Sequence, residues 1–519
     1  MIWRVAAIRR QRGRPHRTKK GRVTIRRGDH HSVRMTHKVA ATSRRRRCAA
    51  VAAPAMVGLF IAFATPAAAA ASAADLDGSK ISLAWIAPFA GLLLSIALLP
   101  LFSPRLWHHH HGKVAAAWTL IFLLPFVGVY GAELATTEVA RTLLLEYLPF
   151  VILLLALFAI AGGVRLKGRL PGTPAANTAL LAFGTLVASV LGTTGATVLL
   201  VRPLIAANRA RRHNAHVFVF FIFLVGNIGG ALTPLGDPPL FLGFLAGVAF
   251  FWPAAHLLLP MLVMSGTLLA IFAVLDSLLH RRERPLPQLD GAADIGIEGK
   301  HNLALLAAVL GAVLMSGLWH SGVRISLLGA DLALENLVRD ALLLALIALS
   351  LRTTRREIYK ANSFSWFPIL EVAKLFAGLF LTIIPAIAIL RAGETGALAP
   401  WVKSLTASDG QPIAAMYFWL TGLLSSVLGN APTYLIFFNT AGGDAVELMG
   451  PLAPTLAAIS AGAVFMGANT YVANAPNFMV KSICEASAVR MPSFFGYMAW
   501  SVGLLFPLYI ALTLIFFPL

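Results

Sequence analysis

The stretch Gly226-Asn-Ile-Gly-Gly-Ala-Leu-Thr-Pro-Leu-Gly-Asp-Pro-Pro-Leu-Phe241 decides the fold of this 519-residue chain. It interrupts a long apolar segment, residues 216–251, with glycines, prolines and one carboxylate. Pro238 and Pro239 have no amide hydrogens, so carbonyl groups upstream of them are left without a helical hydrogen-bond donor. A regular helix therefore cannot run through this point. Inside a membrane, such broken backbone is tolerated only where protein or a water-filled cavity surrounds it. The stretch therefore predicts a discontinuous membrane helix beside a functional cavity.

The same pattern returns near the C-terminus. Thr470-Tyr-Val-Ala-Asn-Ala-Pro-Asn-Phe478 matches Thr233-Pro-Leu-Gly-Asp-Pro-Pro-Leu-Phe241, since both read Thr, three residues, Asp or Asn, one residue, Pro, one residue and Phe. The second copy interrupts another long apolar segment, residues 452–480. Two broken helices of one design predict an internal repeat, which secondary transporters use widely.

Each broken segment follows an apolar segment with a break near its own middle. Residues 177–208 contain Gly192-Thr-Thr-Gly-Ala-Thr197, and residues 412–440 contain Leu428-Gly-Asn-Ala-Pro-Thr433. Small residues and proline at these positions fit re-entrant hairpins, whose irregular backbone must be buried in protein. The resulting alignment pairs Thr197 with Thr433, Thr194 with Asn430, Thr233 with Thr470 and Asp237 with Asn474.

The composition is that of a membrane protein. Hydrophobic residues make up 58% of the chain and charged residues 13%, and the mean hydropathy is +0.76. A soluble domain carries about a quarter charged residues, because its surface faces water. The expected partner of this surface is therefore the lipid bilayer.

Ten apolar stretches follow one another with short polar breaks. If each broken stretch crosses once and each hairpin returns to its own side, the basic loops all fall on one face, as the positive-inside rule requires. The two hairpins then enter from opposite faces. The sequence thus predicts an all-α polytopic membrane protein with about 10–11 spans plus two re-entrant hairpins in an inverted-topology repeat with broken helices. The predicted spans are 81–102, 114–132, 146–163, 216–251, 255–279, 301–320, 335–351, 368–391, 452–480 and 494–517.

The net charge of +21 is concentrated at the N-terminus, where residues 1–48 hold 17 Lys and Arg and one acid, Asp29. Such an arm is too polar to fold alone. It could contact anionic lipid or RNA, but we expect a disordered cytoplasmic extension without a nucleic-acid partner. A true start at Met35 instead of Met1 is an alternative. The next segment resembles a signal peptide, either cleaved or kept as a first membrane helix.

These features divide the chain into five predicted segments. They are a basic disordered cytoplasmic arm (1–47), a signal-peptide-like segment or first membrane helix (48–74), a first transporter half (81–279), a cytoplasmic linker (280–300) and a second transporter half (301–519).

The sequence carries no motif for a cofactor or for enzyme chemistry. Cys48 and Cys484 are the only cysteines, which excludes a disulfide framework and a zinc site of the cysteine type. Neither HExxH nor GxSxG occurs. His108–His111 are interpreted as a polar loop rather than a metal site. We therefore expect a protein that is not an enzyme, with no catalytic residues and no cofactor.

Asp237 is the strongest candidate for ion binding. A carboxylate inside a span is costly and is usually functional; Asp237 could bind Na⁺ or carry a proton. The alternative is that it only caps the second half-helix. Asn227 could polarise the same site or make a helix–helix hydrogen bond. Neutral oxygens at the hairpin tips would complete the site, and they belong to Thr193, Thr194, Thr197, Asn430 and Thr433.

At these motifs the sequence resembles the ion transporter superfamily of arsenite permeases, D-type sodium:proton antiporters, and citrate and dicarboxylate carriers. The resemblance is greatest to the citrate transporter or sodium:proton antiporter group and covers roughly residues 80–519. It is carried by residues 219–245, 425–434 and 465–479. The resemblance implies a central site lined by Thr193, Thr194, Asp237, Asn430, Thr433, Asn474 and Asn477.

The chain departs from the family pattern at one position. Gly429 stands before Asn430, where relatives often have Asp. The missing carboxylate weakens a mechanism with two Na⁺ sites. Homodimers are common among relatives, which makes a homodimer an expectation for this chain.

The expected function is secondary active transport in a bacterial inner membrane, by alternating access. The simplest mechanism is sodium/proton antiport, in which Asp237 exchanges H⁺ for Na⁺. The alternative within this class is cation-coupled transport of citrate or another di- or tricarboxylate. The alternative of another class is an intramembrane enzyme, which needs a nucleophile–base pair or metal ligands that the sequence does not offer.

Overall fold

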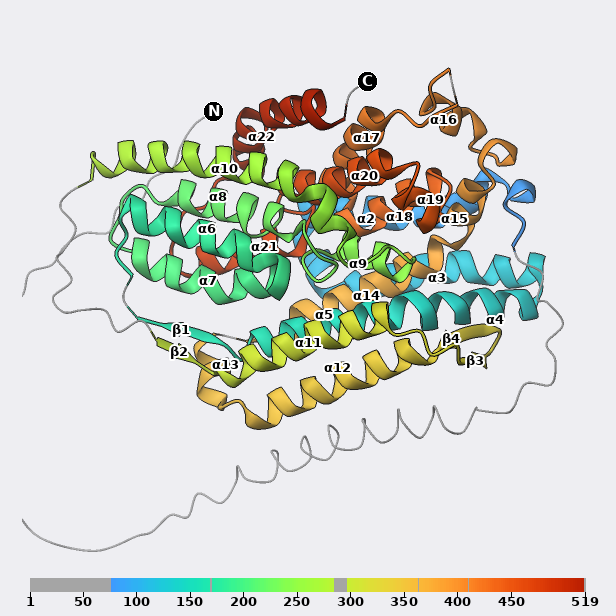
Figure 1. Ribbon diagram of the computed structural model, residues 1–519, viewed down its shortest axis with the longest axis horizontal. Coiled ribbons are helices and arrows are strands. Elements are labelled where there is room, and N and C mark those ends of the chain that lie inside the picture. The colour runs from blue at the N-terminus through green and yellow to red at the C-terminus, as the bar shows by residue number, and fades with distance from the viewer. Residues whose placement is uncertain (1–75, 169, 284–295, 363, 409, 518–519) are drawn as a thin grey trace, which may run out of the picture. The chain divides into compact units, whose positions relative to one another are not determined.

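The computed structural model describes residues 76–168, 170–283, 296–362, 364–408 and 410–517 (Figure 1). The predicted arm (1–47) and the signal-like segment (48–74) lie outside these described residues. The described chain is almost entirely helical, with two short two-stranded sheets. The predicted all-α polytopic class is therefore confirmed.

The first half contains a helical hairpin followed by a broken helix. Its elements are η1 (Gly78–Lys80), η2 (Leu83–Ile86), α2 (Ala87–Phe102), α3 (Pro104–Tyr130), α4 (Ala132–Arg141), η3 (Thr142–Tyr147), α5 (Leu148–Ala161), β1 (Arg165–Lys167), α6 (Pro174–Leu191), α7 (Thr193–Asn208), α8 (Ala215–Leu224), η4 (Ile228–Gly230), α9 (Pro238–Leu245) and α10 (Trp252–His280). Helices α6 and α7 form the hairpin, and α8 and α9 form the two halves of the broken helix.

The second half repeats this order. Its elements are β2 (Gly296–Glu298), α11 (His301–Leu318), β3 (Arg324–Leu327), β4 (Ala330–Ala333), α12 (Leu334–Thr353), α13 (Arg356–Ala361), α14 (Phe367–Thr382), α15 (Ile384–Arg391), η5 (Gly393–Thr395), α16 (Ala399–Ser404), α17 (Ala414–Leu428), α18 (Asn430–Thr440), α19 (Ala445–Met449), α20 (Ala453–Met466), η6 (Gly467–Asn469), α21 (Ala475–Ala486) and α22 (Phe494–Phe516). Helices α17 and α18 form the second hairpin, and α20 and α21 the second broken helix.

Seven helices of the described chain are long and apolar enough to cross a membrane, or eight if the bent pair α14–α15 counts as one span. This is fewer than the predicted 10–11. The predicted spans 216–251 and 452–480 are built from half-helices too short to cross alone, and the predicted span 335–351 forms helix α12, which is not among the seven. The predicted span 146–163 is also wrong at its start, since one helical run extends from Ala132 to Ala161. The histidines His108–His111, predicted to be a loop, belong to α3.

The broken helices supply the core. Helix α8 is apolar on every side, and each residue from Val217 to Val225 is fully buried. Helix α20 is buried from Thr455 to Met466 in the same way. A helix that is apolar all round must be surrounded by protein or lipid. These two half-helices therefore deliver their broken ends to the protein interior.

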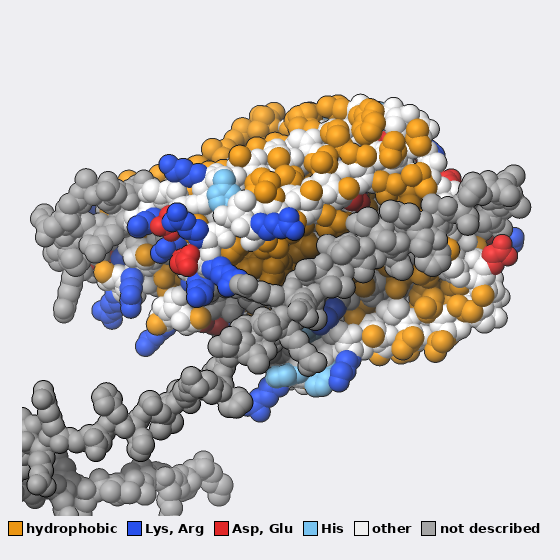
Figure 2. All heavy atoms as spheres, turned by 90° about the horizontal axis from the view of Figure 1, so that it is seen from below, with side chains coloured by type: hydrophobic (Ala, Val, Ile, Leu, Met, Phe, Trp, Pro, Cys, Tyr) orange, Lys and Arg blue, Asp and Glu red, His pale blue; other side chains and the backbone are white. Residues whose placement is uncertain are grey.

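The two hairpins approach the centre of the molecule from different sides. In Figure 1, α6 and α7 lie at the left, and α17 and α18 lie to the right of the centre. Exposed basic residues gather at the left end, which Figure 2 shows as blue side chains. We call it the basic end; it includes Lys167, Arg209, Arg212, Arg281 and Arg282. This arrangement agrees with the predicted inverted-topology repeat.

The repeats superimpose in sequence with a constant offset of 237 residues. Gly192 and Gly429 form the hairpin tips with left-handed φ of 76° and 96° and the same ψ of 149°. Positive φ favours glycine, because glycine has no Cβ. The structure therefore pairs Thr193, and not the predicted Thr194, with Asn430. An alignment on Thr197 and Thr433, whose offset is 236, shifts the hairpin tip by one residue.

The predicted linker 280–300 is partly structured. Its described end, β2, pairs antiparallel with β1, which follows α5. Arg165 Nη1 lies 3.2 Å from Glu298 Oε2 across this sheet. The linker is thus fastened to the first half at the basic end.

Close packing of α17 on α20 depends on small residues. A Cβ at Gly462 would lie 2.5 Å from the Phe418 carbonyl oxygen, which is rigid backbone. We expect Gly462→Ala to lower the free energy of unfolding by about 1–3 kcal/mol, because the helices must separate. Gly266→Ala in α10, where nothing lies within 4 Å, is the control. Equal thermal unfolding temperatures of the two variants in detergent would contradict this packing account.

Candidate functional site

Four helix N-termini converge at the centre of the molecule. Helices α7 and α18 begin at Thr193 and Asn430, directly after the hairpin tips. Helices α9 and α21 begin after their N-cap residues, Asp237 and Asn474. These caps share one backbone conformation, with φ of −140° in both and ψ of 144° and 142°. The aligned peptide dipoles give each N-terminus a partial positive charge. Helices α7, α18 and α21 also carry N-terminal amide hydrogens without a partner inside their helix, whereas α9 begins with Pro238 and Pro239, which have none.

The carboxylate of Asp237 is the centre of the site. It is 1% exposed and accepts hydrogen bonds from three elements. Thr193 Oγ1 donates to Oδ1 at 3.0 Å, Asn474 Nδ2 donates to Oδ1 at 3.1 Å, and Asn430 Nδ2 donates to Oδ2. Asp237 thereby joins both hairpin tips to both broken helices. A carboxylate this deeply buried is tolerated only with such donors.

A chain of amides extends from this centre. Asn474 Nδ2 also donates to Asn227 Oδ1 at 3.1 Å. Asn227 Nδ2 donates to Asn477 Oδ1 at 2.7 Å. Asn477 Nδ2 in turn donates at 2.8 Å to the carbonyl oxygens of Gly467 and Thr470. The broken backbone leaves these carbonyls free, and the amide side chains satisfy them. We call these three asparagines, with Asp237, Thr193 and Asn430, the central polar network.

The structure brings six of the nine predicted site residues into this network. Three others do not bond to Asp237. Thr433 Oγ1 donates to the Gly429 carbonyl of its own helix at 2.8 Å. Thr197 Oγ1 is buried without a hydrogen-bond partner among the described residues. Thr194 is only partly buried. Their participation in binding stays a prediction.

A small apolar cavity lies next to the network. It is lined by residues of α9, α14 and α18, including Leu242, Phe380 and Pro432. Pro432 is two residues from Asn430 in the hairpin tip. The cavity therefore lies between the second hairpin and α14, and its lining is apolar.

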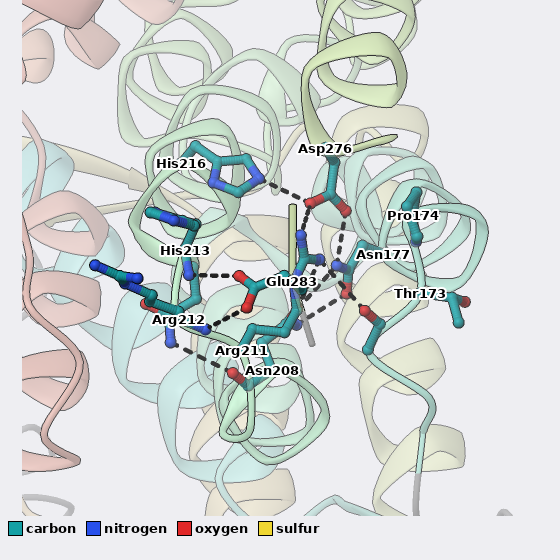
Figure 3. Close-up of polar contacts among 12 residues, drawn as sticks. Thr173, Pro174, Asn177, Asn208, Arg211, Arg212, His213, His216, Asp276 and Glu283 are labelled. Carbon is teal, nitrogen blue, oxygen red and sulfur yellow. Dashed lines mark hydrogen bonds and ion pairs between the residues drawn. The ribbon is translucent and has the colours of Figure 1, made fainter. Parts of the chain in front are cut away.

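A second polar cluster holds the base of the first hairpin at the basic end (Figure 3). Asp276 Oδ1 accepts a hydrogen bond from Arg211 Nη2 and is also hydrogen-bonded to His216 Nε2, at 2.8 Å. Asp276 Oδ2 accepts from Asn177 Nδ2 at 2.9 Å, and Asn177 exchanges hydrogen bonds with Asn208. All five side chains are buried. The sequence analysis does not predict this cluster. Its one signal in the sequence is Asp276, an acidic residue inside the predicted apolar span 255–279.

The cluster anchors α6, α7 and α8 to α10. We expect Asp276→Asn to cost about 3–5 kcal/mol of unfolding free energy, because it leaves the buried Arg211 guanidinium without a counter-charge. Thermal unfolding in detergent measures the effect. The matched control is Glu283→Gln, a carboxylate on the same side that bonds only backbone amides. A cost no larger than that of the control would mean that the ion pair does not hold the hairpin.

Glu283, beyond the end of α10, fastens the loop between α7 and α8. Partial burial disfavours its charged form, but hydrogen bonds from the amides of His213 (2.7 Å) and Arg212 (3.0 Å) outweigh this and lower the pKa of Glu283. Because the pKa of Glu283 is lower in the folded protein, its carboxylate stabilises the loop fully at pH values above the ordinary carboxyl pKa. This stabilisation is lost as the pH falls through the lowered pKa.

We therefore expect acidification through this range to reduce the hydrogen-exchange protection of the Arg212 and His213 amides. Glu283→Gln should make their protection independent of pH across the same range. Protection factors, which remove the intrinsic pH dependence of exchange, are the readout. Protection in the wild type that does not change with pH would refute this role of the carboxylate.

The inverted hairpins, the broken helices and the buried polar network define a class: a secondary transporter. Comparison with known families places the chain within that class. Residues 78–517 match the family described as "Putative citrate transport", and the chain belongs to this family. No curated protein matched the sequence significantly.

Proposed function

We propose that this protein is a cation-coupled transporter of citrate or another di- or tricarboxylate. The observation that supports the proposal best is the convergence of four helix N-termini on one buried site. Each N-terminus has the effect of roughly half a positive charge, so the four together supply roughly two. Asp237 offsets one of these charges. The remainder favours a carboxylate ligand, as it does in transporters with discontinuous helices.

In this proposal Asp237 provides the coupling. The N-terminal amides of α7, α18 and α21 bind the anionic substrate, and α9, whose first two residues are prolines without an amide hydrogen, contributes only the positive end of its dipole. Asp237 takes up the cation, either Na⁺ or H⁺, and its neutralisation strengthens the attraction of the site for an anion. Cation and carboxylate thus bind more strongly together than apart, which is the thermodynamic requirement for symport.

Sodium/proton antiport is a second candidate function. It is favoured by a specific observation, the single carboxylate at the centre of the polar network. In this mechanism Asp237 exchanges H⁺ for Na⁺ and no organic anion is moved. A collapse of the pH gradient in everted vesicles on addition of Na⁺ or Li⁺ would identify it.

The proposed setting is a bacterial inner membrane. The basic end would face the cytoplasm, because loops rich in Lys and Arg are retained on that side. A cysteine-labelling experiment on intact cells, with single cysteines at Arg282 and at exposed Glu394, reports the orientation. Labelling of the Arg282 site from outside would reverse the proposed topology.

We expect proteoliposomes containing the protein to accumulate labelled citrate, or a related dicarboxylate, under an imposed Na⁺ or proton gradient. Asp237→Asn should reduce gradient-driven uptake by about tenfold or more, since a charged hydrogen-bonding group is lost. Citrate binding by the purified variant should be retained, because the helix N-termini remain. This division between uptake and binding is specific to a coupling role.

Asp444→Asn is the matched control, because Asp444 is exposed and caps only the short helix α19. This variant should transport like the wild type. Failure of the folded wild type to take up any carboxylate under either gradient would reject the proposal. If the same preparation also collapses a pH gradient on Na⁺ addition, the antiporter mechanism replaces it.

A further inference from the structure

The π-helix η3 lies within a long membrane helix. It covers Thr142–Tyr147 and belongs to the run from Ala132 to Ala161, which is long enough to cross a bilayer. A π-helix is rare, because its wider turn packs poorly, and it frequently marks a functional site. No residue of η3 belongs to the central polar network or takes part in its hydrogen bonds. The distortion therefore directs attention to the side chains that η3 itself presents.

Glu146 is the titratable residue of η3. It is partly buried, and no hydrogen bond or ion pair joins its carboxylate to another described residue. The neighbouring Tyr147 is anchored, since its hydroxyl donates to the Ala373 carbonyl of α14 at 3.0 Å. The π-helix thus fixes one side chain to the adjacent span and leaves the carboxylate of the other without a donor. An ionisable residue at membrane depth indicates function.

Two charged residues act on the Glu146 carboxylate, Arg391 at the end of α15 and Glu138 on α4. Arg391 Nε donates to Asn439 Oδ1 at 2.7 Å, so the guanidinium is held in place by the second hairpin. Glu138 pairs with Arg141 at 3.5 Å on its own helix. Arg391 is therefore the cation available to balance an ionised Glu146.

The other elements packed on η3 add little charge. Helices α5 and α9 carry no charged residue. On α14, Lys374 lies against Gly112 of α3, and Glu371 is two residues before Ala373. Strand β4 carries Asp331, which is exposed. Glu146 is thus the one carboxylate of η3 in a largely apolar surrounding.

Glu146 is also connected to the centre of the molecule. The ring of Tyr147 lies 6.1 Å from the ring of Phe380. Phe380 lines the small apolar cavity together with Pro432, which belongs to the hairpin tip that holds Asp237. These contacts link η3 through α14 to α18, which carries Asn430 of the central polar network.

We propose that Glu146 is a second proton-binding site of this transporter, paired with Arg391 when ionised and neutral when protonated. A proton fits this site better than a metal cation, because a metal cation needs several oxygen ligands and Glu146 supplies one carboxylate. The energetic reason is that, without hydrogen-bond donors, the anion of a partly buried carboxyl group is costlier to desolvate than its neutral acid. The proposal rests on cation-coupled transport as the proposed function.

Infrared difference spectroscopy of the reconstituted protein tests proton binding directly. Between alkaline and acidic pH we expect a carbonyl-stretch band of a protonated carboxyl group that is free of hydrogen bonds. The band should disappear in Glu146→Gln and remain, shifted, in Glu146→Asp. It should be unchanged in Glu133→Gln, an exposed residue of α4, and should persist in Asp237→Asn. A wild-type spectrum without the band, or a Glu146→Gln spectrum that retains it, overturns the proposal.

A transport experiment separates this proposal from the proposed function. If citrate is the substrate, Glu146→Gln should keep exchange of internal for external citrate, since a permanently neutral side chain allows the loaded carrier to turn over. Uptake driven by a proton gradient should fall at least as far as in Asp237→Asn. Equal losses of exchange and driven uptake contradict a proton relay. If no carboxylate is moved at all, the proposed function fails, and the infrared result still decides whether Glu146 binds a proton.

Discussion

The rest of this structure depends on the burial of one carboxylate where two repeats meet. The Asp237 side chain can be buried to 1% exposure because Thr193, Asn430 and Asn474 donate hydrogen bonds to its carboxylate from three separate elements. Without these donors the anion would cost several kcal/mol in the interior. The hairpin tips and the broken helices must therefore come together to accommodate the ion, and this requirement positions the helix N-termini around it.

The two repeats share their backbone but not their chemistry. The caps of α9 and α21 have nearly identical dihedral angles, yet one is Asp237 and the other Asn474. The hairpin tips likewise differ, with Thr193 in one and Asn430 in the other. A symmetric frame thus holds an asymmetric site with one titratable group. On the proposed function, this asymmetry would give a site for an anion a single place for a coupling cation.

Much of the fold was predictable, because Gly, Pro and Asn report local breaks in apolar segments. The broken helices, the hairpins and most of the central polar network follow from such signals at Gly236–Pro239 and Asn474–Asn477. Long-range partners were not predictable in this way. Asp276 and Asn177 are 99 residues apart and belong to no motif. The apolar pattern predicts a span that begins at Glu146, because composition does not reveal that the helical run starts at Ala132.

The central claim is that carboxylates bind where the N-termini of α7, α9, α18 and α21 converge. An electron cryomicroscopy map of the reconstituted protein, with and without citrate in the presence of Na⁺, tests it most directly. The account predicts citrate density within hydrogen-bonding distance of the N-terminal amides of α7, α18 or α21 and beside Asp237. Citrate density at a different location, or an unchanged and well-ordered central network at saturating citrate, would contradict it.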